Sequence, residues 1–389
     1  MTRVRRLAMG VDEEYLLLDA RSRDLADRGP ALVAATRPEL GAQVRTRRWP
    51  AQLGVRTEPM VDSADLRAEL DWLRTTVAAA ARDAGCRCVA AGTPLLGGVP
   101  AARSAGPPAS VPPQGAVPPR PGEAPPHGGP RDRADGPVCC CGIHIGPLDA
   151  EQAAELAAHL RPWLPVFVTL AANSPFAYGR DTGCASWRSA RFGRRPAAAR
   201  SNRAGPGGPD RPDPARAPHV RAPERRDGRS PCLRPSGRRP TLEVLVPDAN
   251  ADLDTVVLLA VLLRGLATAL LPAVADRRPA PVVPEAWLRQ SYAHASRHGL
   301  RGPGLDPLSG TEAAPRLLLE RMVELAAPGI AAAGDVELVE GLLRRVRRLG
   351  GGAARQRAVH ERWGGLEAVV DALALATSGA DPGLLTPVG

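Results

Sequence analysis

A strand near the N-terminus that carries two carboxylates on one face constrains this chain more than any other stretch. Side chains alternate between the two faces of a strand, so Asp12 and Glu14 within residues 8–19 project from the same side. The opposite side carries Val11, Tyr15 and Leu17. Neighbouring carboxylates repel unless a cation lies between them, and Mg²⁺ prefers oxygen ligands of this kind. Taken alone, the run favours a solvated acidic edge strand; the rest of the chain favours the cation site.

Composition indicates a globular protein without a membrane span. The 389 residues are 44% hydrophobic, enough for one large core or two ordinary ones. The longest apolar run, residues 255–271, is interrupted by Arg264 and is too short to cross a bilayer. The first six residues lead into a strand pattern and not into the apolar core of a signal peptide. We therefore expect a cytoplasmic protein with no membrane partner and, despite seven cysteines, reduced thiols.

The positive charge of the chain is confined to one tract. Residues 191–240 hold 14 arginines and four acidic residues, which accounts for the whole formal net charge of +10. One alternative function is therefore a nucleic-acid binder that uses this tract as a cationic arm. The tract lacks the interleaved aromatic residues that stack on bases, which disfavours this alternative. No lysine occurs in the chain, so phosphate contacts must come from arginine, backbone amides or a metal ion.

Two low-complexity tracts interrupt what otherwise reads as a single domain over residues 1–389. They span about residues 99–137 and 191–240, and they contain too few apolar residues to offset the entropy of ordering. We predict that both are disordered. Their abrupt edges suggest the hypothesis that the gene is read in a shifted frame across them. Resequencing tests this hypothesis, and the absence of family-like sequence in every alternative frame contradicts it.

The hydrophobic periodicity predicts strands in the first part of the chain and helices mainly in the last. The expected strands are residues 8–19, 52–57, 86–93, 138–146 and 241–246. The expected helices are residues 30–40, 63–85, one that starts after Asp149, and then 252–271, 284–298, 313–325, 336–349 and 366–375. A glycine loop at residues 350–352 precedes Arg355 and Arg357, which we expect to solvate the last helices without a specific partner.

Two later strands each present a polar residue opposite apolar neighbours. In residues 138–146, His144 lies on the face opposite to Ile143 and Ile145. In residues 241–246, Glu243 is flanked by apolar residues and must face something polar on its own side of the sheet. A lone histidine is more often a satisfied core residue than a ligand, and Arg188 has the simpler alternatives of a helix C-cap or a pair with Asp181.

Five motifs in this order resemble the YbdK-like carboxylate–amine ligases, also known as type 2 glutamate–cysteine ligases. The resemblance covers about three quarters of the chain. The motifs are residues 10–17 (GVDEEYLL), 141–146 (CGIHIG), 172–188 with ANSPF, GRDTG and SWR, 241–244 (TLEV) and 352–357 (GAARQR). One such string is a weak signal, whereas five in the right order are a strong one.

The resemblance implies an α+β fold of the glutamine-synthetase catalytic type, in which an antiparallel sheet carries a Mg²⁺-ATP site and helices cover its back. It implies that ATP phosphorylates a carboxylate and that an amine then attacks the acyl phosphate. The expected cofactors are ATP and Mg²⁺, and the expected substrates are glutamate or another carboxylate and cysteine or another amine. Such chemistry needs positioning and charge neutralisation more than a covalent nucleophile. Ligases of this type commonly pair, which is consistent with a homodimer.

The resemblance also assigns roles to particular residues. Asp12, Glu14 and Glu243 would hold the magnesium ions. His144 would lie beside the ions near the phosphates, and Arg188, with Ser186 beside it, would contact the nucleotide or a substrate carboxylate. These assignments make His144 and Arg188 the expected catalytic residues.

This chain departs from the family pattern at four positions. Gly54 stands where the family carries a glutamate that binds metal, and Leu245 stands where it carries an arginine. Gly142 replaces a histidine, and Asp12 is one methylene shorter than the family glutamate. A lost metal ligand reduces turnover even where nucleotide still binds. The resemblance therefore leaves two alternatives, a ligase with impaired activity and a catalytically dead relative that serves as a binding module.

Overall fold

The structure is a computed structural model, and it describes residues 6–97, 136–193, 232–236 and 239–379. The predicted disorder of residues 99–137 and 191–240 falls almost entirely outside these ranges. The prediction of disorder is wrong near the C-terminal end of the second tract. Leu233–Pro235 forms strand β8, because Leu233 is buried in the core and the strand pairs with its neighbour.

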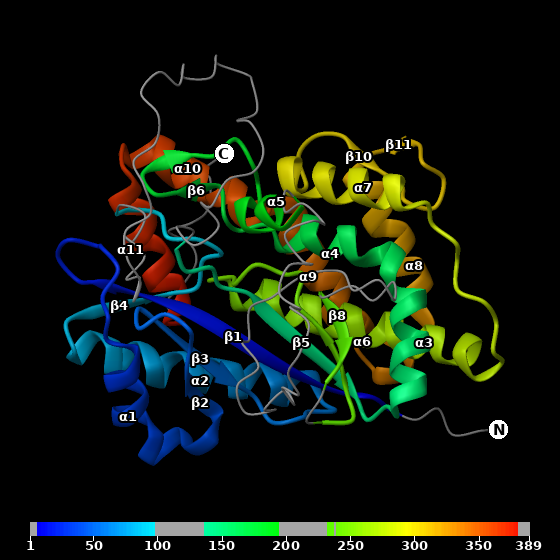
Figure 1. Cartoon of the computed structure of the whole chain (residues 1–389), viewed down its shortest axis with the longest axis horizontal. Coiled ribbons are helices and arrows are strands. Elements are labelled where there is room, and N and C mark those ends of the chain that lie inside the picture. Colours follow the sequence, from blue (N-terminus) through cyan, green and yellow to red (C-terminus); the bar gives the residue numbers. More distant parts are fainter. Residues whose placement is uncertain (1–5, 98–135, 194–231, 237–238, 380–389) are drawn as a thin grey trace, which may run out of the picture. The chain divides into compact units, whose positions relative to one another are not determined.

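An antiparallel sheet of seven strands is the centre of the described part of the chain (Figure 1). The order is β2-β3-β1-β5-β9-β8, and β4 also pairs with β1. The strands are β1 (Ala8–Asp19), β2 (Val44–Thr46), β3 (Gln52–Arg56), β4 (Cys86–Val89), β5 (Cys141–Gly146), β8 (Leu233–Pro235) and β9 (Leu242–Val244). The predicted strand at residues 138–146 is therefore shorter than expected. All the expected strands are present, and β2 and β8 of this sheet were not predicted. Two short ribbons were not predicted either, β6 (Phe176–Ala177) with β7 (Arg180–Asp181) and β10 (Gly304–Leu305) with β11 (Glu312–Ala313).

The register of the sheet places the predicted polar residues on one face. Asp12 pairs with Arg56 on β3 and with Gly142 on β5. His144 lies opposite Gly10 on one side and opposite Glu243 on the other. Because cross-strand partners project to the same side of a sheet, all these side chains share what we name the polar face.

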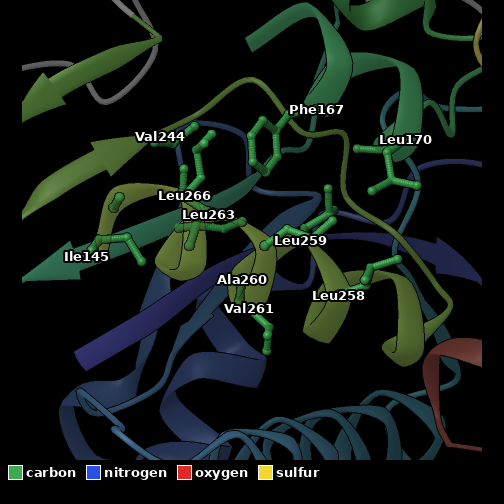
Figure 2. Close-up of a cluster of buried hydrophobic side chains, with 14 of the residues drawn as sticks. Ile145, Phe167, Leu170, Val244, Leu258, Leu259, Ala260, Val261, Leu263 and Leu266 are labelled. Atoms are coloured by element: carbon green, nitrogen blue, oxygen red, sulfur yellow. The ribbon is translucent and has the colours of Figure 1, made fainter. Parts of the chain in front are cut away.

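The other face of the sheet packs on α6 (Leu253–Ala275), whose side chains are apolar along most of its length. Figure 2 shows Leu263 and Leu266 of this helix close to Ile145 and Val244 of the sheet. By length and hydropathy α6 is the one described helix that would span a membrane, but 72% of its apolar window is buried inside the protein. We conclude that α6 is a core helix.

The remaining helices cover the sheet and each other. They are α1 (Gly29–Leu40), α2 (Ser63–Asp83), α3 (Ala150–Leu160), α4 (Leu164–Ala171), α5 (Trp187–Gly193), α7 (Glu285–His298), α8 (Pro315–Ala333), α9 (Val336–Leu349), α10 (Gly352–Trp363) and α11 (Leu366–Thr377). Asp149 caps α3 as predicted, with a capping box that includes Gln152. Asp62, and not the predicted Ser63, caps α2, because the Asp62 side chain accepts the backbone N–H of Ala64 at 2.7 Å. The end of α8 extends beyond the predicted residue 325 despite Pro328.

A buried ion pair joins β1 to α2 on the apolar side of the sheet. Glu13 accepts two hydrogen bonds from Arg74, at 2.5 and 2.9 Å, and both side chains are 1% exposed. Arg74 also donates to the carbonyl oxygens of Asn250 and Ala251, so its guanidinium group is hydrogen-bonded to a carboxylate and to two carbonyl groups. The hydroxyl of Tyr15 donates to Glu13, and burial together with this negative charge raises the pKa of Tyr15 well above its usual value.

Candidate active site

Three adjacent strands bring Asp12, His144 and Glu243 together on the polar face. We name these residues the three-strand cluster. The His144 Nε2 atom lies 3.5 Å from Asp12 Oδ2 and 3.6 Å from Glu243 Oε1. One ligand atom from each residue lies within 4.8 Å of the others, and all three residues are at most 9% exposed. Residues more than 200 positions apart in the sequence therefore converge, as the sequence analysis expected.

The donor set of the three-strand cluster fits one divalent cation. The buried His144 Nε2 atom has no hydrogen-bond partner among the described residues, while Nδ1 of the same ring lies 3.3 Å from Thr241 Oγ1. An unpartnered buried ring nitrogen between two carboxylates is unfavourable without a ligand. Carboxylate oxygens suit Mg²⁺ or Mn²⁺, and an imidazole nitrogen is a common additional ligand. Asp12, His144 and Glu243 are therefore the residues that would hold such an ion.

Two arginines, Arg56 on β3 and Arg45 on β2, hold Asp12 in place. Arg56 donates from Nε and Nη2 to the two carboxylate oxygens of Asp12, at 3.0 and 2.6 Å, and Arg45 pairs with Oδ2. Burial alone would raise the pKa of Asp12. The nearby His144 ring, the hydrogen bonds from Arg56 and the positive charges of Arg45 and Arg47 together outweigh burial and hold this pKa well below its usual range. Asp12 therefore stays ionised at a lower pH than an ordinary aspartate does.

Glu14 shares the polar face but lies outside the three-strand cluster. One of its carboxylate oxygens accepts the backbone N–H of Cys140 at 2.9 Å, and the other lies 3.3 Å from Nη1 of Arg47. Gly54 lies directly opposite Glu14 in the sheet. A Cβ atom added at Gly54 would lie 2.7 Å from Cζ of Arg47, so the guanidinium group fills the space above this glycine.

Glu243 also has an arginine partner on its outer side. Nε of Arg234, on β8, donates to Glu243 Oε2 at 2.8 Å, and Arg234 is aligned with Glu243 in the sheet register. The other carboxylate oxygen, Oε1, faces His144. Glu243 thus bridges the edge strand and the three-strand cluster.

The two substituted positions Gly142 and Leu245 are in contact. A Cβ atom added at Gly142 would lie 3.0 Å from Cδ2 of Leu245 and 3.3 Å from Cβ of Asp12. The leucine side chain therefore covers the glycine and forms an apolar wall beside Asp12. Gly142 and Leu245, at which the motifs differ from the expected family pattern, therefore share one volume beside the polar face.

Arg188 and Ser186 belong to a different polar network, which is centred on Asp248. Arg188 is 4% exposed and donates from Nε to Asp248 Oδ1 at 2.8 Å and from Nη2 to the carbonyl oxygens of Val246 and Pro247. The Ser186 hydroxyl donates to the same Asp248 oxygen at 2.9 Å. The structure directs these groups at Asp248 and not at the three-strand cluster, so a nucleotide contact of Arg188 or Ser186 stays a prediction.

Asp248 joins two segments of the motif at residues 172–188. Its second carboxylate oxygen accepts the backbone N–H of Asn173 at 2.9 Å and the hydroxyl of Ser174 at 2.8 Å. Residues 173–174 and 186–188 are therefore fastened to the chain that follows β9. This buried network gives a structural reason for both segments of the motif.

The expectation that Arg355 and Arg357 have no specific partner is wrong. Arg355 is 3% exposed and pairs with Asp252 at 3.0 Å. Arg357 donates to both carboxylate oxygens of Asp181, at 2.7 and 2.8 Å, beside a surface cavity of about 150 Å³. Arg355 is buried in the core and Arg357 pairs at the surface, and both partners lie far away in the sequence, so sequence spacing did not reveal either contact.

Sequence reasoning missed four arginines of the polar face. They are Arg45, Arg47, Arg56 and Arg234. The alternation of residues 44–47 (VRTR) was a signal for two of them, because it places both arginines on one side of an extended segment. Arg234 lies inside the low-complexity tract, where its role was hidden by the many other arginines.

Comparison with known sequences agrees with the motifs. The family model described as glutamate–cysteine ligase family 2 (GCS2) matches residues 8–372. A Saccharopolyspora erythraea protein named "Putative glutamate--cysteine ligase 2-1" is 35% identical over 394 residues, which cover 94% of this chain and 93% of that protein. A Mycolicibacterium vanbaalenii protein named "Putative glutamate--cysteine ligase 2-2" is 32% identical, with coverage of 95% and 97%.

Comparison with solved structures supports the fold. The glutamate–cysteine ligase of Francisella tularensis, solved in complex with AMP, has a TM-score of 0.57 at 9% identity and covers 98% of this chain and 91% of its own. A bifunctional glutathione synthetase from Pasteurella multocida has a TM-score of 0.57 at 13% identity, covering 97% of this chain and 52% of its own. These likenesses confirm the α+β fold of the glutamine-synthetase type. With the family match over almost the whole sequence, they lead to one conclusion: this chain belongs to glutamate–cysteine ligase family 2, the YbdK-like carboxylate–amine ligases.

Proposed function

We propose that this chain is a cytoplasmic, ATP-dependent carboxylate–amine ligase of the glutamate–cysteine ligase type. The observation that carries the proposal is the convergence of Asp12, His144 and Glu243 within 4.8 Å on the polar face of the sheet. The proposed acid is glutamate or another carboxylate, and the proposed amine is cysteine or another amine. ATP and Mg²⁺ are the proposed cofactors.

The proposed mechanism assigns simple roles to the residues of the polar face. A bound magnesium ion supplies charge neutralisation for phosphoryl transfer, which depends mainly on positioning and electrostatic stabilisation. Asp12 and Glu243 would hold the ion, and Arg56 keeps the Asp12 carboxylate oriented through its paired hydrogen bonds. The burial of His144 excludes water from the same place.

The test is a magnesium-dependent assay of ADP release by the full chain with glutamate and a series of amines, cysteine included. We expect ADP release that requires Mg²⁺, the acid and an amine. Glu243→Gln removes one carboxylate charge from the three-strand cluster and should lower turnover by more than about 100-fold. Glu324→Gln, an exposed change on α8 that removes the same charge, is the matched control. Equal turnover in the two variants would contradict the proposed site.

A catalytically inactive binding module is the second candidate, and the arginine pairs of the polar face favour it. Each of Asp12, Glu14 and Glu243 already has a guanidinium partner, with which a metal ion must compete. In the same assay, nucleotide binding without ADP release under any combination of acid and amine would support this candidate and exclude the ligase.

Nucleic-acid binding through residues 191–240 gains no support from the described part of that tract. Arg234 pairs with Glu243, and Arg239 lies 3.9 Å from Glu58. Both arginines therefore face acidic groups of the fold. Salt-sensitive retention of the chain on RNA or DNA, lost when the tract is deleted, would restore this alternative.

A further inference from the structure

We propose that the Glu14 end of the polar face is an arginine-based oxyanion site, which binds a phosphate group of a polyphosphate chain without a divalent cation at that end. Arg47 and Arg45 are its binding groups. The inference rests on the proposed function in one respect, since it takes the polyphosphate chain to be that of the nucleotide. It deepens that function by dividing the polar face into one end suited to a cation and one end suited to an anion.

A metal ion does not fit the Glu14 end. Glu14 already accepts the backbone N–H of Cys140 on one oxygen, and Arg47 lies against the other. Gly54, its partner on β3, has no side chain to supply an oxygen, and Arg47 fills the space where a side chain at this position would lie. Mg²⁺ and similar divalent cations need several oxygen ligands. The Glu14 end of the polar face presents guanidinium groups where those oxygen ligands would have to lie.

The balance of charge favours an anion at this end. The ion pairs of the polar face use three carboxylates but four guanidinium groups, because Asp12 is shared by Arg45 and Arg56 while Arg47 and Arg234 each take one carboxylate. The excess positive charge lies on the β2 side, where Arg45 and Arg47 are two residues apart. Arginine presents a planar fork of donors that matches phosphate oxygens.

Two guanidinium donors at the Glu14 end have no hydrogen-bond acceptor in the described part of the chain, and we place the oxyanion beside them. Nε of Arg45 and Nε of Arg47 are both buried and have no acceptor among the described residues. The Arg47 side chain is only 10% exposed, so water does not readily solvate its remaining N–H groups. A buried donor without an acceptor is unfavourable. The Arg45 side chain is 28% exposed and gives the site a route from solvent.

The experiment titrates the full chain with tripolyphosphate and with ATP by calorimetry, once in EDTA and once with Mg²⁺. We expect saturable binding of tripolyphosphate in EDTA. Arg47→Gln should weaken it by about tenfold or more, because a charge-assisted hydrogen bond is lost. Gly54→Ala should weaken it as well, because the added Cβ displaces the Arg47 guanidinium without removing its charge. Arg316→Gln, on an arginine side chain that is 78% exposed on α8, removes the same charge and should have no effect.

Each outcome has a definite meaning. Binding that appears only with Mg²⁺, or that is unchanged in Arg47→Gln and Gly54→Ala, overturns the inference. Thermal unfolding of each variant shows whether it is folded. If Arg47→Gln is unfolded, the binding of tripolyphosphate by Gly54→Ala and Arg45→Gln tests the inference instead, and unchanged binding in both overturns it. Equal affinity for tripolyphosphate and ATP shows that the site recognises the phosphate chain alone, whereas tighter binding of ATP shows that it recognises the nucleotide.

The inference and the proposed function fail separately. Binding in EDTA that depends on Arg47, in a chain that releases no ADP with any acid and amine, leaves the oxyanion site standing and removes the ligase. Magnesium-dependent ADP release in a chain that binds no tripolyphosphate in EDTA leaves the ligase standing and removes the oxyanion site.

Discussion

Three successive acidic residues of β1 show how the alternation of a strand separates structural from functional roles. Asp12 and Glu14 face the polar side of the sheet, while Glu13 faces the helices and pairs with Arg74. Asp12 and Glu14 are held by arginines that also have donors to spare, so their surroundings can accept a ligand. The surroundings of Glu13 are closed, because every neighbour of its carboxylate is a protein group in the core.

We predict that Arg74→Met destabilises the fold severely. The substitution leaves Glu13 buried without its charge partner, and breaking a buried pair in this way costs about 3–5 kcal/mol of the free energy of unfolding. Urea denaturation followed by circular dichroism measures the loss. Arg82→Met, at an exposed position near the end of the same helix, is the control and should change stability by less than about 0.5 kcal/mol. A loss below about 1 kcal/mol for Arg74→Met would contradict the structural role.

Individual site residues were predictable from sequence only where a local pattern carries the information. Alternation places Asp12, His144 and Glu243 on strand faces, and the motif order relates them to one another. No local pattern reveals that Arg47 lies over Gly54 or that Arg188 turns toward Asp248. These contacts depend on strand register and on chain segments that are distant in the sequence. Long-range contacts therefore decide what each arginine does.

At the scale of elements, α6 and α8 make a close helix contact in the core. Gly265 of α6 and Gly329 of α8 face each other, and a Cβ atom added at Gly329 would lie 2.8 Å from the carbonyl carbon of Gly265. Two glycines let the helix backbones approach at a point where side chains would separate them. The sequence predicted both helices, because apolar periodicity is a local signal. It did not predict this contact, which depends on how two helices cross.

We predict that Gly329→Ala lowers the free energy of unfolding by about 1–3 kcal/mol, because the added methyl group overpacks the contact between α6 and α8. Gly341→Ala is a matched control in the middle of α9, where an added Cβ has Arg344 Nη2 at 3.9 Å as its nearest neighbour. That change should stabilise the protein by about 0.5–1 kcal/mol, since alanine favours the helix. Thermal and urea unfolding of the two variants should therefore move in opposite directions, and a shift in the same direction would refute the close contact.

At the scale of the whole molecule, the acidic groups that tie distant segments together make the fold sensitive to low pH. Asp252 caps α6 and pairs with Arg345 of α9 at 2.6 Å and with Arg355 of α10 at 3.0 Å. Burial raises the pKa of Asp252, but the charges of Arg355 and Arg345 lower it more, so the net shift is downward. One carboxylate thus connects three helices that are far apart in the chain.

We predict that Asp252 contributes stability that is lost in acid. Its folded pKa lies below the unfolded value of about 3.9, so its contribution is complete above that pH and declines as the pH falls through the folded pKa. The free energy of unfolding of the native chain should therefore fall more steeply below about pH 4 than that of Asp252→Asn. Asp276→Asn, at a side chain that is 66% exposed, is the control. Parallel pH profiles for the native chain and Asp252→Asn would contradict the prediction.

The sequence also indicated the architecture of the whole molecule, through the order of its motifs. Five short motifs in the family order implied the α+β fold, and the family match and the sheet confirm it. The low-complexity tract at residues 191–240 could not be interpreted in this way, because its composition hides the strand β8. Leu233–Pro235 pairs in register with β9, although it lies within that tract.

The contact between Leu245 and Gly142 makes the order of mutations at this site matter. A bulky residue introduced at position 142 meets the leucine at 3.0 Å, and shortening Leu245 first opens the space that such a residue needs. Because the two positions share one volume, their substitutions are coupled and their effects should not add. A side chain introduced at position 142 has to displace the terminal methyl of Leu245, so it should be accepted more readily in a variant that already carries a smaller residue at position 245.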